Sequence, residues 1–330
     1  MIAVLCPGQG SQTPGMLAPW LELPGVADRL ASFSEAAQTD LTAHGTTSDA
    51  DTIRDTAVAQ PLIVATSLLA LREILGDRPA ADVVDVTAGH SVGELTAAAV
   101  AGVLTDADAV GLVAHRARAM AAAAAATPTG MSAVVGGAPA EVLDAIAAAG
   151  ASPANVNGGG QVVAAGDLES LVRLAEAPPA RARVIPLQVA GAFHTAYMQP
   201  ALDAFAPVAS SWPAADPALP LLTNADGSAY GAASAGAHGH GTASDVVAHL
   251  VAQIVAPVRW DLCQETLAAL GVTAILELAP GGVLTGLAKR TLKGVELLAV
   301  KSPADLDAAR DLVARHSGNP NRTTTEEITA

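Results

Sequence analysis

The stretch Val83–Val100, VVDVTAGHSVGELTAAAV, decides the fold of this chain. Val83–Thr87 is a short β-branched run with the length of a buried strand. Gly89–Gly93 (GHSVG) follows at once with the pattern G-x-S-x-G, and Glu94–Val103 is rich in alanine and leucine, which favour a helix. A strand, a sharp glycine-flanked turn and a helix predict a serine, Ser91, whose hydroxyl projects from the turn as a nucleophile. The alternative is a turn whose serine only caps the helix.

Outward from this stretch, strand-like and helical segments alternate. Met1–Leu5 is a short apolar run that enters a glycine-rich loop, and Ala57–Ile74 and Asp106–Ala126 have the length and composition of helices. Near the C-terminus, Ala274–Glu277 and Val295–Ala299 have the length of strands. This alternation predicts an α/β fold with a mostly parallel sheet.

The pattern changes in the middle of the chain. Strand-like Met131–Val135, Val162–Ala165 and Arg183–Val189 are separated by helical Pro139–Ala149 and Leu168–Ala177. This order predicts a small inserted α+β subdomain of ferredoxin-like type.

The domain organisation follows from this change. We expect a core made of residues 1–128 and 193–316, with the ferredoxin-like insertion over residues 129–192. Residues 317–330 are polar and rich in threonine, which predicts a disordered tail. The loop Gly227–Thr242 is rich in Gly, Ala, Ser and His, and the sequence assigns it no role.

The charge balance excludes one class of partner. The 330 residues include 17 Lys and Arg against 32 Asp and Glu, which gives a formal net charge of −15. A protein that binds a phosphate backbone needs a basic surface, so we expect no nucleic-acid partner.

Membrane and metal binding are not expected either. No stretch approaches the ~20 consecutive apolar residues of a spanning helix, since the runs near Leu62–Leu71 and Ala97–Leu104 are short and interrupted. The N-terminus has no basic region of the kind that begins a signal peptide. Cys6 and Cys263 form no disulfide framework and have no metal-ligand spacing. We expect a cytoplasmic protein without metal or cofactor.

A serine nucleophile needs a base within hydrogen-bond reach. Of the 8 histidines, His194 has the best position, in a loop that follows the last predicted strand of the insertion. His90 lies inside the turn and would point away from the Ser91 hydroxyl. No Asp or Glu near His194 in the sequence could orient its ring, so the residues alone do not complete a triad.

Two further segments could take part in chemistry. Gly8–Gln12 resembles a phosphate-binding loop in its glycine content but has neither the lysine nor the spacing, and a loop that offers a backbone N–H to an oxyanion fits equally well. Arg116 lies on an alanine-rich helix, where its stem could cover apolar surface. Its planar guanidinium could instead bind a substrate carboxylate.

Together these segments resemble the malonyl-CoA:acyl carrier protein transacylase family. The resemblance covers nearly the whole chain, and the combination of motifs is far more specific than any one of them. The matching segments are Pro7–Gln12, Gln60-Pro61, Gly89–Glu94, Arg116, Asn155–Gly166, Phe193–Thr195, Asn224, Gln253–Val258 and Glu277–Gly281.

The resemblance implies an α/β-hydrolase-like core and a ping-pong reaction. Ser91, activated by His194, would attack malonyl-CoA, and the malonyl-serine ester would then be attacked by the phosphopantetheine thiol of acyl carrier protein. The family orients its histidine through a backbone carbonyl, which matches Gln253 here. That match removes the need for a carboxylate.

The resemblance also assigns the remaining site residues. The backbone N–H groups of Gln9 and Val92 would form the oxyanion hole, and Arg116 would bind the malonyl carboxylate in bidentate fashion. Phe193, directly before His194, resembles the residue at this loop position in the malonyl-selective members of the family. Its ring would leave little room for an α-methyl branch, although one methyl group gives only ~1–3 kcal/mol of discrimination.

Several alternatives remain open at this stage. The same chemistry could serve a polyketide pathway instead of type II fatty acid synthesis. A serine esterase or acyl-CoA hydrolase would release CoA steadily without acyl carrier protein, and a non-catalytic binding module could retain the fold. The intact set Ser91, His194 and Arg116 disfavours the last of these.

Acyl carrier proteins are themselves acidic, so docking onto a chain of charge −15 requires a local basic patch. Lys289, Arg290 and Lys293 lie within five residues of one another and are the predicted docking residues. The alternative is ordinary charge at a helix end that complements the helix dipole. We expect the enzyme to be a monomer.

Overall fold

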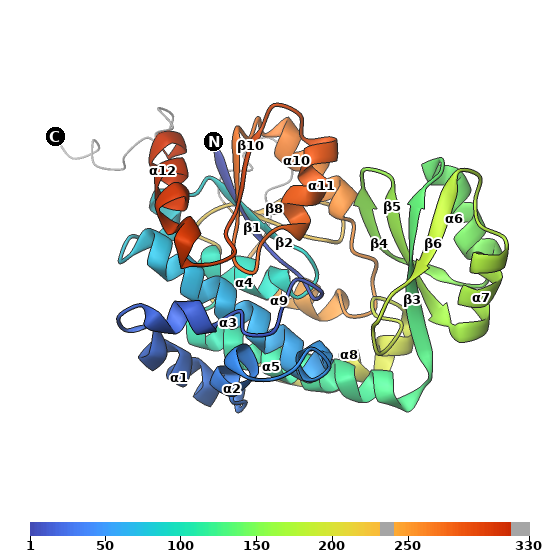
Figure 1. Ribbon diagram of the computed structural model, residues 1–330, viewed down its shortest axis with the longest axis horizontal. Coiled ribbons are helices and arrows are strands. Elements are labelled where there is room, and N and C mark those ends of the chain that lie inside the picture. Colours follow the sequence, from blue (N-terminus) through green and yellow to red (C-terminus); the bar gives the residue numbers. More distant parts are fainter. Residues whose placement is uncertain (232–240, 318–330) are drawn as a thin grey trace.

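The computed structural model describes residues 1–231 and 241–317, and a mostly parallel sheet forms its centre (Figure 1). Within these residues the sheet has six strands, and the first five in the order below pair in parallel. The last pair is antiparallel. The predicted α/β fold is confirmed. The order across the sheet is β10 (Glu296–Ala299), β9 (Ala274–Glu277), β1 (Ile2–Cys6), β2 (Val86–Gly89), β7 (Leu221–Leu222) and β8 (Ala229–Tyr230).

Helices cover both faces of this sheet, which explains why every residue of β1 is buried. Alternate residues of β1 point to opposite faces. Ile2, Val4 and Cys6 belong to the larger apolar cluster, whereas Ala3 and Leu5 belong to a second cluster on the other face. A strand buried on both sides therefore reads as a continuous apolar run in the sequence.

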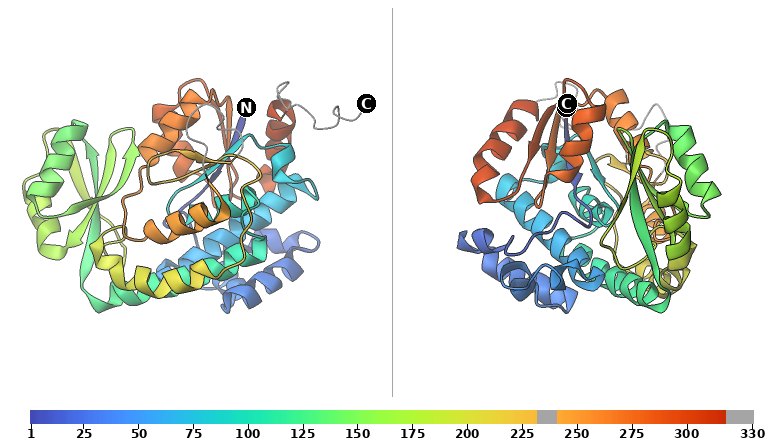
Figure 2. Two further views of the ribbon diagram at one scale, coloured as in Figure 1. Left: turned by 180° about the vertical axis from the view of Figure 1, so that it is seen from behind. Right: turned by 45° about the vertical axis from the view of Figure 1, so that its right-hand side comes forward.

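Most helices that pack on the larger cluster lie below the sheet in the view of Figure 1, and those that pack on the second cluster lie above it. Seen from behind, α8 and α9 lie side by side below the sheet (Figure 2). The helices on the larger-cluster side are α1 (Val26–Ala37), α2 (Leu41–Thr46), α3 (Thr56–Leu75), α4 (Gly93–Val100), α5 (Asp106–Ala126), α8 (Gln199–Ser210), α9 (Ala243–Ala252) and α12 (Leu306–His316). The helices on the other side are α10 (Trp260–Ala269) and α11 (Val283–Thr291).

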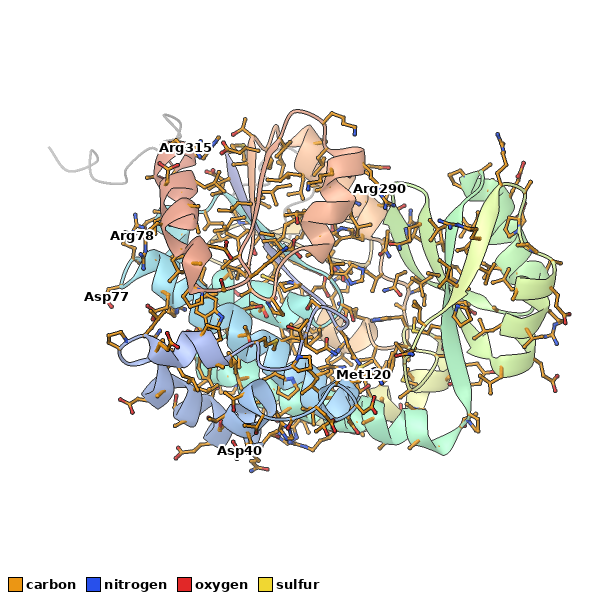
Figure 3. All side chains as sticks on the ribbon, viewed as in Figure 1. Asp40, Asp77, Arg78, Met120, Arg290 and Arg315 are labelled. Carbon is orange, nitrogen blue, oxygen red and sulfur yellow. The ribbon has the colours of Figure 1, made fainter. Side chains whose placement is uncertain are left out.

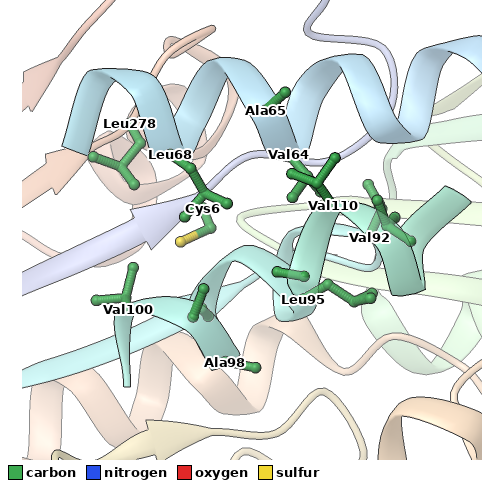
Figure 4. Packing of buried hydrophobic residues seen from close by; sticks show 14 of the residues in the cluster. Cys6, Val64, Ala65, Leu68, Val92, Leu95, Ala98, Val100, Val110 and Leu278 are labelled. Carbon is green, nitrogen blue, oxygen red and sulfur yellow. The ribbon is translucent and has the colours of Figure 1, made fainter. Parts of the chain in front are cut away.

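The long helix α3 corrects one expectation. Among the described helices it alone is long and apolar enough to cross a membrane by length and composition, so the statement that no stretch approaches spanning length is wrong for Thr56–Leu75. However, 83% of its apolar window is buried inside the protein. In Figure 4, Val64 of α3 lies near Val92 at the start of α4, and Leu68 lies next to Cys6 of β1. It is a core helix, and it supports the turn that carries Ser91.

A second sheet of four antiparallel strands lies to the right of the core in Figure 1. Helices α6 and α7 pack on one face of it, and the strand order with two helices is that of a ferredoxin-like subdomain. In chain order its elements are β3 (Thr129–Gly136), α6 (Pro139–Ala148), β4 (Ser152–Gly158), β5 (Gln161–Asp167), α7 (Leu168–Glu176) and β6 (Ala182–Pro186).

The sequence analysis missed strand β4, which has the sequence SPANVNG. Proline, asparagine and glycine all disfavour strands, and such residues are tolerated at the edge of a sheet. β4 is an edge strand that pairs only with β5 in its own sheet. It also joins the core, because Val258 donates its N–H to Ala154 and Val156 donates to the Val258 carbonyl, each at 2.8 Å.

Some predicted boundaries also differ. β2 begins at Val86 and not at Val83, since the N–H groups of Val83 and Val84 both donate to the Ala80 carbonyl in a preceding turn. The last predicted strand of the insertion ends at Pro186. The tail is described only at residue 317, and most of the loop 227–242 also lies outside the described residues.

Candidate active site

Ser91 lies in the turn between β2 and α4, with a left-handed φ of 53°. A Cβ on Gly89 would lie 1.9 Å from the carbonyl carbon of Gly93, and a Cβ on Gly93 would lie 2.2 Å from the Cys6 carbonyl oxygen. Only glycine fits at either position, and the sharpness of the turn follows from that. The N–H of Ser91 donates to Oδ1 of Asn224 at 2.8 Å. Asn224 follows the neighbouring strand β7, and this bond helps to hold the strained residue.

His194 meets the serine from the loop between β6 and α8. Its Nε2 lies 2.7 Å from Oγ of Ser91, and its Nδ1 lies 2.8 Å from the backbone oxygen of Gln253. A carbonyl oxygen can only accept, so Nδ1 carries the proton and Nε2 of the neutral ring is free to accept from the serine hydroxyl. No described carboxylate contacts this ring.

The protonation state of His194 follows from its surroundings. Burial is the main cause that lowers the pKa of His194, to about 3, and the positive charge of Arg116 lowers it further. The hydrogen bond to the Gln253 carbonyl acts in the opposite direction. The imidazole is therefore neutral, and able to accept a proton, across the physiological pH range.

Arg116 reaches the same serine from α5 and is fully buried. Its Nη1 donates to Oε1 of Gln60 at 2.6 Å, its Nη2 donates to Oε1 of Gln253 at 2.8 Å, and Nη2 lies 3.5 Å from Oγ of Ser91. Burial lowers the pKa of Arg116 to about 10, so the guanidinium keeps its charge at neutral pH. Two side-chain amides thus hold a cation beside the nucleophile.

The loop that carries Gln9 lies against the serine turn. A Cβ on Gly8 would be 2.7 Å from the His90 carbonyl oxygen, so the two backbones are in close contact. Gln9 and Ser91 line the same cavity, and the backbone N–H groups of Gln9 and Val92 have no hydrogen-bond partner within residues 1–231 and 241–317. Donors without partners next to Ser91 are suited to an oxyanion.

The cavity has a volume of about 220 Å³ and lies between the core and the insertion. Phe193 and Met120 line it near Ser91 and His194, while residues of β4, β5 and α11 form other walls. In Figure 3, Met120 lies where the core helices meet the insertion. The walls of the cavity include both apolar side chains and the polar groups of the serine site.

The position of His90 can be compared with the prediction made from the sequence. The ring of His90 turns away from the Ser91 hydroxyl, as expected, and its Nε2 lies 2.9 Å from Oδ1 of Asn157 in the insertion.

Two buried residues of the site were given no role in the sequence analysis. Glu94 directly follows the serine motif, and its carboxylate accepts from the N–H of Asn224 at 2.5 Å and from Nε2 of Gln253. Asn224 also donates to the Gly89 carbonyl at 2.8 Å. Burial raises the pKa of Glu94, while the Asn224 bond, the Arg116 charge and the Gln253 bond oppose that rise. The only signal in the sequence for a role of Glu94 and Asn224 was their place in segments that match the family.

The predicted docking cations lie on and after the last turn of α11. Lys289, Arg290 and Lys293 are all exposed, and Nζ of Lys293 donates to the Lys289 carbonyl at 2.7 Å, which is ordinary helix-end behaviour. Leu284 and Leu287 on the same helix line the cavity. Figure 3 shows Arg290 on the side of the core that faces the insertion. The cations therefore lie on or directly after a helix that lines the cavity, and none of the three is a lining residue.

Comparison with known proteins agrees with this geometry. A family model described as "Acyl transferase domain" matches residues 4–312. The chain is 54% identical over 312 residues to the malonyl CoA-acyl carrier protein transacylase of Mycobacterium tuberculosis (strain H37Rv), covering 94% of this chain and 100% of the relative. It is 35% identical over 321 residues to the protein of that name from Escherichia coli (strain K12), covering 94% and 99%.

Solved structures give the same result. The crystal structure of MCAT from Mycobacterium tuberculosis superimposes with a TM-score of 0.87 at 53% identity, covering 94% of this chain and 99% of the other. A malonyl-transacylase in complex with a type II PKS acyl-carrier protein superimposes with a TM-score of 0.82 at 31% identity, again covering 94% and 99%.

Proposed function

This chain belongs to the acyl transferase domain family, among the malonyl CoA-acyl carrier protein transacylases, and we propose that Ser91, His194 and Arg116 carry out its reaction. The chain moves a malonyl group from malonyl-CoA to acyl carrier protein. The assignment of roles rests on one observation. Oγ of Ser91 lies 2.7 Å from a neutral histidine nitrogen and 3.5 Å from a buried guanidinium.

In the first half-reaction, Nε2 of His194 takes the Oγ proton as Ser91 attacks the thioester carbonyl of malonyl-CoA. A new C–O bond forms and the carbonyl oxygen becomes an oxyanion. When the C–S bond breaks, the His194 proton passes to the CoA thiolate, and a malonyl-serine ester remains. The Gln253 carbonyl keeps the imidazole in the tautomer that this step needs.

The partnerless N–H groups of Gln9 and Val92 support their role as the oxyanion hole. Backbone donors fixed before the reaction stabilise charge as it develops, and each is worth about 10²–10³-fold in kcat in comparable enzymes. Val92 also lies at the N-terminus of α4, whose dipole favours negative charge.

Arg116 supplies the selectivity for a diacid. Gln60 and Gln253 fix the guanidinium, whose remaining N–H groups are suited to a carboxylate about one acyl-chain length from Ser91. An acetyl group has no carboxylate and would leave this buried cation unpaired. Phe193 is the proposed limit on branching at the α-carbon, because its ring lines the same cavity.

In the second half-reaction the thiol of phosphopantetheine replaces CoA, and His194 acts again as base and then acid. We propose Lys289, Arg290 and Lys293 as the residues that attract the acidic carrier protein. Their exposure on and directly after a helix that also lines the cavity supports this role.

The wider setting is also proposed. We place the reaction in type II fatty acid synthesis, in the cytoplasm. The enzyme is proposed to act as a monomer, since Ser91, His194, Gln253 and Arg116 meet without a residue from a second copy.

Release of CoA distinguishes a transacylase from an acyl-CoA hydrolase. With malonyl-CoA alone, we expect one burst of CoA per enzyme and then a stall, and addition of acyl carrier protein should restore continuous release. Steady CoA release without the carrier would support the hydrolase instead. No release in either case would contradict any acyl transfer from CoA.

A further inference from the structure

We propose that Glu94 is a positioning residue that fixes the orientation of the Gln253 amide and, through it, the guanidinium of Arg116. The inference rests on the proposed roles of Ser91 and Arg116. It adds a residue that touches neither the substrate nor the reacting atoms.

The Gln253 side chain lies between a hydrogen-bond donor, Arg116, and a hydrogen-bond acceptor, Glu94. Arg116 can only donate, so Gln253 must turn Oε1 toward it, and the observed distance to Nη2 is 2.8 Å. The amide nitrogen then faces the other way, where it donates to Glu94, and it also lies 3.1 Å from the Ser91 carbonyl. Oδ1 of Asn224 lies 3.3 Å from the same nitrogen. Glu94 makes the shortest of these three contacts, so the acceptor at position 94 contributes most to this orientation of the amide.

Glu94 meets a second donor at its other oxygen. Oε1 accepts from the backbone N–H of Asn224, and Oδ1 of Asn224 accepts in turn from the N–H of Ser91. The side chain of Glu94 is 4% exposed, so water cannot replace either partner. Two N–H donors face the two oxygens of one carboxyl group, and a carboxylate satisfies both at once.

A glutamine at position 94 has the same shape but only one acceptor oxygen. If its NH₂ faced Asn224, two donors would meet there. If its NH₂ faced Gln253, that amide would have to rotate and present its own NH₂ to Arg116. Either arrangement leaves a buried polar group unsatisfied, and the second disturbs the guanidinium directly.

The test compares the initial rates at which Ser91 is acylated by malonyl-CoA and by acetyl-CoA, by rapid quench and intact-protein mass spectrometry. In Glu94→Gln we expect the malonyl-to-acetyl rate ratio to fall by about tenfold or more, because the arginine that recognises the carboxylate is misaligned. Glu94→Asp keeps two acceptor oxygens on a shorter stem and should give an intermediate ratio. It also provides the readout if Glu94→Gln does not fold.

Glu277→Gln is the matched control. Glu277 is a fully buried carboxylate that accepts two backbone N–H groups, from Leu284 at 2.9 Å and Thr285 at 2.8 Å. Within residues 1–231 and 241–317, no hydrogen bond or ion pair joins it to Ser91, Arg116 or Gln253. Its substitution should reduce the folded fraction without changing the ratio. A comparable ratio change in Glu277→Gln would mean that loss of any buried carboxylate has this effect, which would overturn the proposal.

The decisive arm is Glu94→Gln in an Arg116→Ala background. If Glu94 acts through Arg116, the second substitution leaves the ratio of the Arg116→Ala enzyme unchanged. An equal further fall, or an unchanged ratio in the single variant, would overturn the proposal. Failure of the wild type to form any malonyl-enzyme would instead contradict the proposed function.

Discussion

Ser91 and His194 are 103 residues apart in the sequence, yet their side chains meet at 2.7 Å and both residues have a left-handed backbone, with φ of 53° and 60°. A positive φ is uncommon for residues other than glycine, so tertiary contacts must hold it here. The Ser91 N–H is fixed by Asn224, and the His194 ring is fixed by the Gln253 carbonyl. The contact between base and nucleophile is therefore a property of the whole fold.

The first prediction concerns the base. His194→Ala removes the acceptor for the Ser91 proton, and the rate of serine acylation by malonyl-CoA should fall by about 10²–10⁴-fold. Single-turnover rapid quench measures this rate. His115→Ala is the control, since His115 packs on Trp212 away from the site and should leave the rate unchanged. Acylation at the wild-type rate in His194→Ala would rule out His194 as the base.

Arg116→Ala should remove malonyl selectivity. Loss of one partner of a buried charge pair costs about 2–5 kcal/mol, so acylation by malonyl-CoA should fall by about 30-fold or more, while acetyl-CoA gains in relative terms. Arg116→Lys should recover only part, because an ammonium lacks the planar fork. Arg118→Ala is the control, because Arg118 lies on the same helix but donates to the Ala37 carbonyl instead. Unchanged malonyl kinetics would contradict the carboxylate contact.

The pH profile should reflect the lowered pKa of His194. A histidine of ordinary pKa 6.5 would be about 3% neutral at pH 5, with an activity loss of about 30-fold relative to higher pH. Because burial and Arg116 lower the pKa of His194 to about 3, the neutral base persists to pH 5 and is lost only below it. The acylation rate should therefore be nearly level between pH 5 and 7. A fall centred near pH 6.5, with the protein still folded by circular dichroism, would contradict this environment.

Charge reversal should separate the two half-reactions. Lys289→Glu with Arg290→Glu should raise the KM for acyl carrier protein several-fold, with a smaller effect at high salt, and should spare self-malonylation. Arg78→Glu is the control, because Arg78 is an exposed arginine at the opposite end of the molecule (Figure 3). Equal loss of both half-reactions would count against docking at α11.

The sequence was most informative at positions where only one type of residue fits. Gly89 and Gly93 leave no room for a Cβ, and the motif around Ser91 could be recognised for that reason. The apolar run of β1 was equally clear because both faces of that strand are buried. Strand β4 was missed because its residue types disfavour strands. Pro153 is tolerated at the edge of the sheet, and the asparagines of β4 line the cavity, and local strand propensity predicts neither.

The partners of the reactive residues were harder to predict. The orientation of His194 depends on a backbone carbonyl, and any residue type carries one. Arg116, Gln60 and Gln253 come from three separate helices or their ends and meet only in the fold. Glu94 is adjacent to the motif, but its role depends on Asn224 and Gln253, which lie far along the chain.

Intact-protein mass spectrometry after brief mixing with malonyl-CoA tests the central claim most directly. The wild type should gain the mass of one malonyl group, and peptide mapping should place it on Ser91. Ser91→Ala should gain none while remaining folded. A wild-type protein without the added mass, or a Ser91→Ala protein that still gains it, would contradict the account.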